Sequence, residues 1–148
     1  MSAPTAYVEA LQTTLAAEHA ALYVFGALGA QTSQSGAPTL YAALTEAYET
    51  HRARRDQLSA RIRDLGADPV PAEPAYELPR RLGTPDAVTR EALAVERACA
   101  TTYAYLVANS PSAERRYAVD LLVQTAVREL AFRGTPETFP GSDEHADR

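Results

Sequence analysis

The sequence predicts an all-α fold, a bundle of four helices, and three observations support this prediction. Prolines stand at or just before the start of four long segments without proline, where a helix tolerates a missing N–H. Apolar residues recur at helical spacing in each of these segments. One ionisable side chain interrupts each apolar seam, and these four are Glu18, His51, Glu96 and Glu129. The pattern is typical of a bundle with a polar centre.

The proline-bounded segments predict helices over roughly residues 5–32, 38–66, 85–109 and 112–133. Short links rich in Gly, Ser, Asn or Pro join the first two helices and the last two, so each pair should form a hairpin. Residues 67–84 contain four prolines and should be an extended crossover. Residues 1–133 are thus expected to form one domain, followed by a polar tail, 134–148, that is expected to be loose unless Phe139 attaches it.

The two predicted hairpins are similar in sequence. Leu15-Ala-Ala-Glu-His-Ala aligns with Leu93-Ala-Val-Glu-Arg-Ala, and the same offset carries His51 onto Glu129. Counting from the two turns puts all four seam residues at similar heights, about 24 Å along their helices. The crossover can span about 60 Å, enough to place the third helix parallel to the second. We therefore expect the four side chains to converge near the middle of the bundle.

Composition excludes several kinds of chemistry. All 14 basic residues are arginine, which excludes a lysine Schiff base and a P-loop lysine. Cys99 is the single cysteine, so there is no disulfide within the chain and no cysteine-type zinc site. The net charge of −5 argues against nucleic acid as a partner. The longest near-apolar stretch, 20–30, is too short to cross a membrane, and without a targeting signal we expect a cytoplasmic protein.

Carboxylates in an apolar core must be neutralised, and the sequence leaves two ways open. A divalent metal with oxygen and nitrogen ligands is one, which suits iron or manganese bound by Glu18, His51, Glu96 and Glu129. The other is a network of protein side chains without metal. In that network Glu18 would bond Tyr48 or His51, and Glu96 or Glu129 would pair with a buried arginine such as Arg55.

Four segments carry a resemblance to a known family. The segments Ala16-Ala-Glu-His-Ala-Ala-Leu-Tyr, His51-Arg-Ala-Arg-Arg-Asp, Pro74-Ala-Tyr-Glu-Leu-Pro and Phe139-Pro-Gly resemble the DUF4439 ferritin-like domains over nearly the whole chain. The resemblance implies a ferritin-like four-helix bundle, and it brings no established activity with it. Together with the mixed-charge, Arg-rich segment 52–63, it leaves a homodimer open.

The sequence departs from the ferritin-like di-iron pattern, which places a Glu on helices one and three and Glu-x-x-His on helices two and four. Glu18, Glu96 and His51 match that pattern, but Tyr48 and Ala126 stand at the two motif glutamates, and Glu129 stands at the second histidine. We therefore expect a non-catalytic or ligand-binding domain with a degenerate metal site and no cofactor. A metal-dependent oxidoreductase or metal-binding protein using iron or manganese is the alternative. The small residues Gly26, Gly29 and Ala100 allow two interpretations, room for an unidentified small apolar ligand or tight alanine-based helix packing, and the sequence leaves both open.

Overall fold

Four helices account for the regular secondary structure of residues 3–142, the part of the chain that the computed structural model describes. They are α1 (Ala3–Ala30), α2 (Pro38–Asp64), α3 (Pro85–Asn109) and α4 (Arg115–Ala131). The predicted all-α class is therefore confirmed. Residues 143–148 of the expected tail lie outside the described range.

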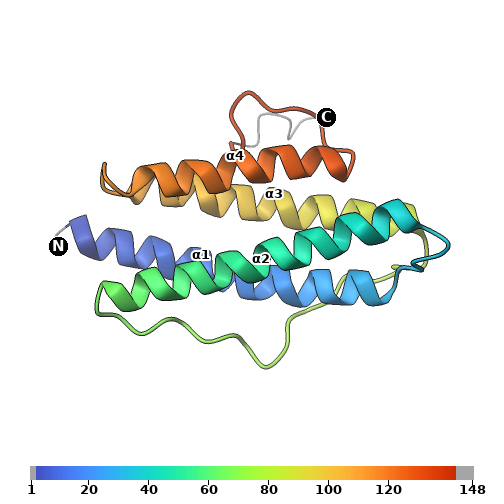
Figure 1. Ribbon diagram of the computed structural model, residues 1–148, viewed down its shortest axis with the longest axis horizontal. Helices are drawn as coiled ribbons and strands as arrows, with labels where there is room; N and C mark the ends of the chain where they lie inside the picture. The colour runs from blue at the N-terminus through green and yellow to red at the C-terminus, as the bar shows by residue number, and fades with distance from the viewer. Residues whose placement is uncertain (1–2, 143–148) are drawn as a thin grey trace.

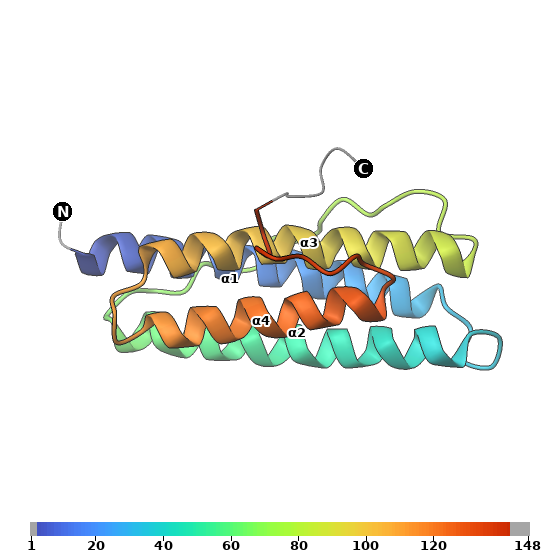
Figure 2. The same cartoon turned by 90° about the horizontal axis from the view of Figure 1, so that it is seen from above.

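The helices run antiparallel within each hairpin, as Figure 1 shows. After α2 the chain travels back along the whole bundle before α3 starts, so α3 runs parallel to α2 (Figures 1 and 2). The helix α1 packs against both α2 and α3, and α4 packs mainly on α3. This topology places the middle of all four helices at the same height. Within the described helices, none is long and apolar enough to cross a membrane.

The crossover is fixed to α1 by side chains that bond its backbone. Gln12 donates from Nε2 to the carbonyl of Asp68 at 2.7 Å, and its Oε1 accepts from the amide of Val70 at 2.8 Å. His19 Nε2 lies 3.0 Å from the Val70 carbonyl, and the rings of Tyr23 and Tyr76 meet at 5.5 Å. Because a proline-rich segment has few N–H groups for regular structure, these contacts to α1 hold it in place.

The helix ends follow local sequence signals. Pro38 and Pro85 open α2 and α3, and the Thr84 hydroxyl accepts from the Ala87 amide at 3.1 Å. The chain leaves α2 through Gly66, whose φ of 80° suits glycine. At the start of α4, residues 112–114 form a turn because the Pro111 carbonyl accepts from both Glu114 and Arg115. Regular helix there begins at Arg115, three residues beyond the sequence-based start.

The tail after α4 turns back over the bundle (Figures 1 and 2). Phe139, expected to attach it, is 68% exposed. Gly141 makes a close contact with α3, where an added Cβ would lie 2.6 Å from the carbonyl oxygen of Ala100. This contact depends on the absence of a side chain, so no apolar residue in the sequence signals it.

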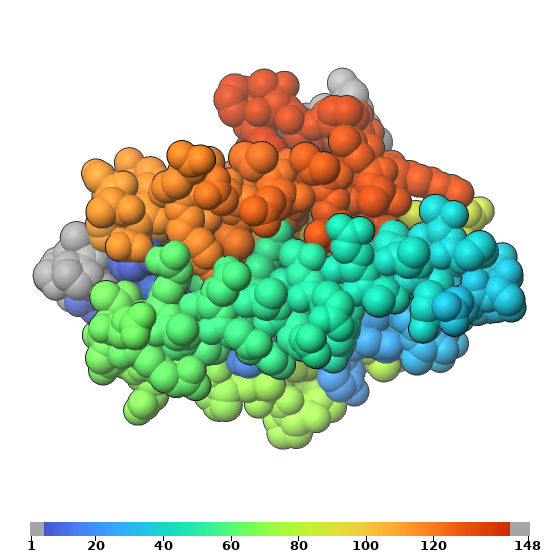
Figure 3. Space-filling view, in the orientation of Figure 1, coloured from blue at the N-terminus to red at the C-terminus, as the bar shows by residue number. Residues whose placement is uncertain are grey.

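The core combines apolar packing with a buried polar layer. Each helix contributes apolar side chains to it, with Phe25, Leu58, Tyr103 and Leu121 as examples. Charged or polar side chains are also buried, among them Glu18, His51, Arg54, Glu96 and Glu129. Side chains of α2 and α4 meet along the face shown in Figure 3. The polar residues are thus enclosed at mid-bundle.

Candidate functional site

Three of the four predicted site residues meet in the centre of the bundle. Glu18 on α1, His51 on α2 and Glu96 on α3 are each fully buried. His51 Nδ1 lies 2.5 Å from Glu18 Oε2, and His51 Nε2 lies 3.0 Å from Glu96 Oε1. The histidine therefore bridges two carboxylates that come from the two different hairpins.

The contacts of His51 determine its charge. A carboxylate only accepts hydrogen bonds, so both ring nitrogens donate when both face carboxylates, and that form is the imidazolium. Burial lowers the pKa of His51, but the hydrogen bonds that it donates to Glu18 and Glu96 outweigh this effect and raise the pKa to about 9. Phe25 covers one face of the ring, stacked at a centroid distance of 5.2 Å. His51 is thus a buried cation at neutral pH.

Arg54 is a second buried cation in this layer, so His51 and Arg54 together match the negative charges of Glu18 and Glu96. Its Nη1 donates to the Tyr103 hydroxyl at 3.0 Å and to Thr125 Oγ1 at 2.7 Å. The Tyr103 hydroxyl in turn donates to Glu18 Oε1. Burial lowers the pKa of Arg54, but Tyr103 and Glu18 more than offset this effect. The guanidinium of α2 therefore connects through a phenol to the glutamate of α1.

The buried arginine is Arg54, and the sequence-based choice of Arg55 was wrong. Arg55 leaves 35% of its side chain exposed and pairs with the adjacent Asp56 at 2.8 Å. Arg54 is 2% exposed. A signal for this was present, because residues 47, 51, 54, 58 and 62 follow one another at spacings of three or four and form one face of α2. Glu18 bonds His51, one of the two partners expected from the sequence, and its other carboxylate oxygen accepts a bond from Tyr103, which was not among the expected partners.

Arg128 extends the network beyond Glu96. Its Nε lies 3.8 Å from Glu96 Oε1, its Nη2 donates to Thr50 at 2.9 Å, and its Nη1 lies 3.7 Å from Glu46. The order of contacts is therefore Arg54, Tyr103, Glu18, His51, Glu96 and Arg128. Each of the two buried carboxylates therefore lies against the cationic ring of His51, and Arg128 is shared between Glu96 and Glu46.

Glu129 is buried as expected but lies apart from this chain of contacts. It is 2% exposed, and its Oε1 makes no hydrogen bond in the described part of the protein. Burial, followed by the negative charge of Glu137, raises the pKa of Glu129 to about 7, and Arg97 opposes this shift. The glutamate of α4 is therefore near its midpoint of protonation at neutral pH.

The geometry does not fit a divalent metal. Both nitrogens of His51 are engaged by carboxylates, whereas a metal ligand must present a free nitrogen lone pair. The Arg54 side chain also brings a positive charge into the same layer. Among residues 3–142, no group of three or more His, Cys, Asp or Glu side chains could hold a metal ion. Tyr48 is only half-buried and faces α1 beside Gly26, away from the charges.

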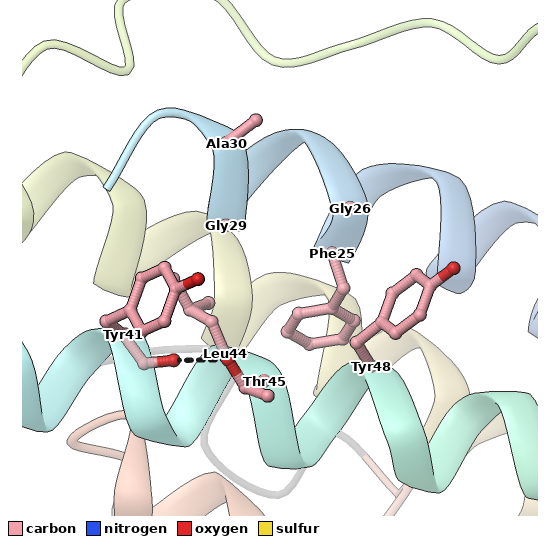
Figure 4. Close-up of a pocket in the computed structure, with 8 residues that line it drawn as sticks. All are labelled: Phe25, Gly26, Gly29, Ala30, Tyr41, Leu44, Thr45 and Tyr48. Carbon is pink, nitrogen blue, oxygen red and sulfur yellow. Dashed lines mark hydrogen bonds between the residues drawn. The ribbon is translucent and has the colours of Figure 1, made fainter. Parts of the chain in front are cut away.

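A separate hollow of about 280 Å³ lies between α1 and α2 (Figure 4). Gly26 and Gly29 leave room there, and Phe25, Tyr41 and Tyr48 supply aromatic walls. No charged side chain lines it. The hollow borders the charge network, since the Phe25 ring that lines it also stacks on His51. Ala100, also expected near free space, is buried beneath Gly141.

Comparisons with known proteins agree on a family and a fold. A family model described as a domain of unknown function, DUF4439, matches residues 10–144. The crystal structure of Rv2844, a conserved hypothetical protein from Mycobacterium tuberculosis, is similar with a TM-score of 0.79 and 27% sequence identity. That similarity covers 89% of this chain and 91% of the other. The search of curated proteins found no match.

Proposed function

This chain belongs to the DUF4439 family, and we propose that it is a ferritin-like bundle in which an internal charge network stands in place of a metal centre. In this proposal the domain is non-catalytic and acts by binding. The family description names no activity, and the geometry of the centre supports the proposal.

The observation that carries the proposal is the position of His51 between Glu18 and Glu96. A buried imidazolium bonded by two carboxylates is already satisfied, and displacing its protons by a metal would cost those bonds. Arg54 completes the balance of charge. The same arrangement offers no nucleophile, because burial holds the pKa of the nearby Cys99 thiol well above its ordinary value.

The binding role would use the hollow at Gly26 and Gly29. Its aromatic walls and lack of charged lining suit a small apolar ligand, although its volume of about 280 Å³ sets a narrow limit on size. Titration with small aromatic probes, followed by nuclear magnetic resonance, tests this part. We expect chemical-shift changes centred on Tyr41 and Tyr48, and none at those residues would contradict it. A homodimer and a cytoplasmic location remain predictions from the sequence.

A metal-binding protein is the second candidate, and one observation favours it. Glu96 Oε2 and Glu129 Oε1 are buried carboxylate oxygens without a hydrogen bond among the described residues. Such oxygens are ligands that iron and manganese accept. The cationic His51 and Arg128 oppose this candidate because both lie against Glu96.

Metal analysis separates the two candidates. The protein is produced with added iron and manganese, and its metal content and melting temperature are measured. We expect less than stoichiometric metal, and no rise in melting temperature on adding iron, manganese or zinc. Stoichiometric metal that is lost in a Glu18→Ala, Glu96→Ala double variant would overturn the proposal. A single Glu77→Ala variant, altered in the exposed crossover, is the control.

A further inference from the structure

A polar hollow beside the network, lined by residues that take no part in it, carries a separate inference. It has a volume of about 590 Å³ and lies between α1, α2 and the crossover. Arg55, Ser59 and Arg63 line it from α2, and because they are four residues apart they share one face of that helix. His19 lines it from α1, and residues 69–71 of the crossover form its remaining wall.

We propose that this hollow binds a phosphoryl-bearing anion through Arg55, Ser59 and Arg63. Guanidinium groups bond phosphate oxygens in pairs, and a serine hydroxyl donates a further bond. The two arginines are eight residues apart, which is about 12 Å along the helix axis. That separation suits an anion with two phosphoryl groups better than a single phosphate, with Ser59 between them.

Arg63 and Ser59 have unused capacity for such a ligand. Most other arginines of the same basic segment are committed elsewhere: Arg52 pairs with Glu49, Arg54 enters the core, and Arg61 pairs with Glu114. Within residues 3–142, the Arg63 guanidinium and the Ser59 hydroxyl make no hydrogen bond or ion pair. The Arg63 guanidinium and the Ser59 hydroxyl thus line the hollow as donors that have no acceptor among the described residues.

The walls of the hollow are held in place before any ligand arrives. His19 bonds the carbonyl of Val70, and Gln12 bonds the backbone on both sides of Pro69. These contacts fix the crossover against α1, so little ordering is needed on binding. Asp56 is the one carboxylate among the lining residues, and it engages Arg55 at 2.8 Å. An anion would have to compete with Asp56 for Arg55.

Calorimetric titration of the full chain with inorganic pyrophosphate tests the proposal, at constant ionic strength. We expect binding at about millimolar concentration or tighter. Arg63→Gln and Arg55→Gln should each weaken it about tenfold. The matched control Arg52→Gln removes the same charge from the same helix outside the hollow and should leave affinity unchanged. Asp56→Asn should tighten binding severalfold because it frees Arg55.

Three further titrations identify the ligand chemistry. Inorganic phosphate and a phosphomonoester should each bind more weakly than pyrophosphate, and a phosphomonoester that matches pyrophosphate would overturn the assignment of two phosphoryl groups. Succinate, a dicarboxylate, should bind at least tenfold more weakly. No binding of any phosphoryl anion, or equal losses in Arg52→Gln and Arg63→Gln, would overturn the proposal. Because all of these residues lie outside the buried network, circular dichroism should show each variant folded.

Discussion

The imidazole of His51 and the carboxylate of Glu18 are in direct contact at the centre of the bundle, with 2.5 Å between Nδ1 and Oε2. Both side chains are fully buried. Their contact joins α1 to α2 within the first hairpin, and the second nitrogen of His51 joins that hairpin to α3. One protonated ring therefore connects three helices.

A double-mutant cycle measures this contact. Glu18→Gln and His51→Gln should each destabilise the fold by about 3–5 kcal/mol, since each leaves a buried charge without its partner. The double variant should be more stable than the sum of the two losses predicts, with a coupling of about 1–3 kcal/mol. Urea unfolding provides the free energies. Additive effects would show that the contact contributes nothing to stability.

Arg54 and Arg55 are adjacent in sequence but should differ strongly in their contribution to stability. Arg54→Ala removes a buried cation that bonds Tyr103 and Thr125, and we expect a loss of about 3–5 kcal/mol. Arg55→Ala removes an exposed pair with Asp56 and should cost less than about 1 kcal/mol. Arg54→Lys keeps the positive charge but lacks the planar guanidinium, so its loss of stability should lie between the losses of the two alanine variants. Equal losses in the two alanine variants would contradict the assignment of Arg54 to the network.

The fold and much of the centre could be predicted because helical periodicity determines which face of each helix is buried. The number of residues between each side chain and its hairpin turn predicted that Glu18, His51 and Glu96 lie at the same level along the bundle axis, since the rise per residue of a helix is constant. The choice between Arg54 and Arg55 did not follow in the same way. Both lie one helical turn after His51, and a long arginine side chain can be placed in the core or at the surface from neighbouring positions.

Glu129 and the tail show a second limit of the sequence. Periodicity correctly buries Glu129, but the contacts of a carboxylate depend on side chains from other helices. Arg128 is the neighbour of Glu129 in the sequence, but its guanidinium reaches Glu96 and Thr50. The tail is held by close backbone approach at Gly141, and such an approach leaves no apolar pattern in the sequence.

Stability should fall as the pH rises through the titration of His51. Its pKa is about 9 in the folded protein against 6.5 ordinarily, so the folded state holds this proton more tightly. The stabilisation is fully present below about pH 6.5 and is lost as the pH rises through about 9. The free energy of unfolding should therefore decrease from pH 6 to pH 9.5. The His51 ring signals should titrate near pH 9, and titration below pH 7 would contradict the imidazolium.

Glu129→Gln should stabilise the protein at pH 8. Burial raises the pKa of Glu129 from 4.5 to about 7, so the folded state disfavours its charged form. The resulting loss of stability starts as the pH rises above about 4.5 and is complete above about 7. Glutamine carries no charge, so the variant should melt several degrees higher than the wild type at pH 8 and equally at pH 4.5. Glu77→Gln, in the exposed crossover, should show no such difference.

Gly141→Ala should release the tail from α3. The φ of Gly141 is 81°, and an added Cβ would lie 2.6 Å from the backbone oxygen of Ala100, so the variant must shift both backbones. We expect a cost of about 1–3 kcal/mol for keeping the tail in place, which favours its detachment. Limited trypsin digestion, read by mass spectrometry, should then cleave faster after Arg133. Gly83→Ala is the matched control, because its Cβ would meet nothing within 4 Å, and equal cleavage rates in the two variants would contradict the attachment through Gly141.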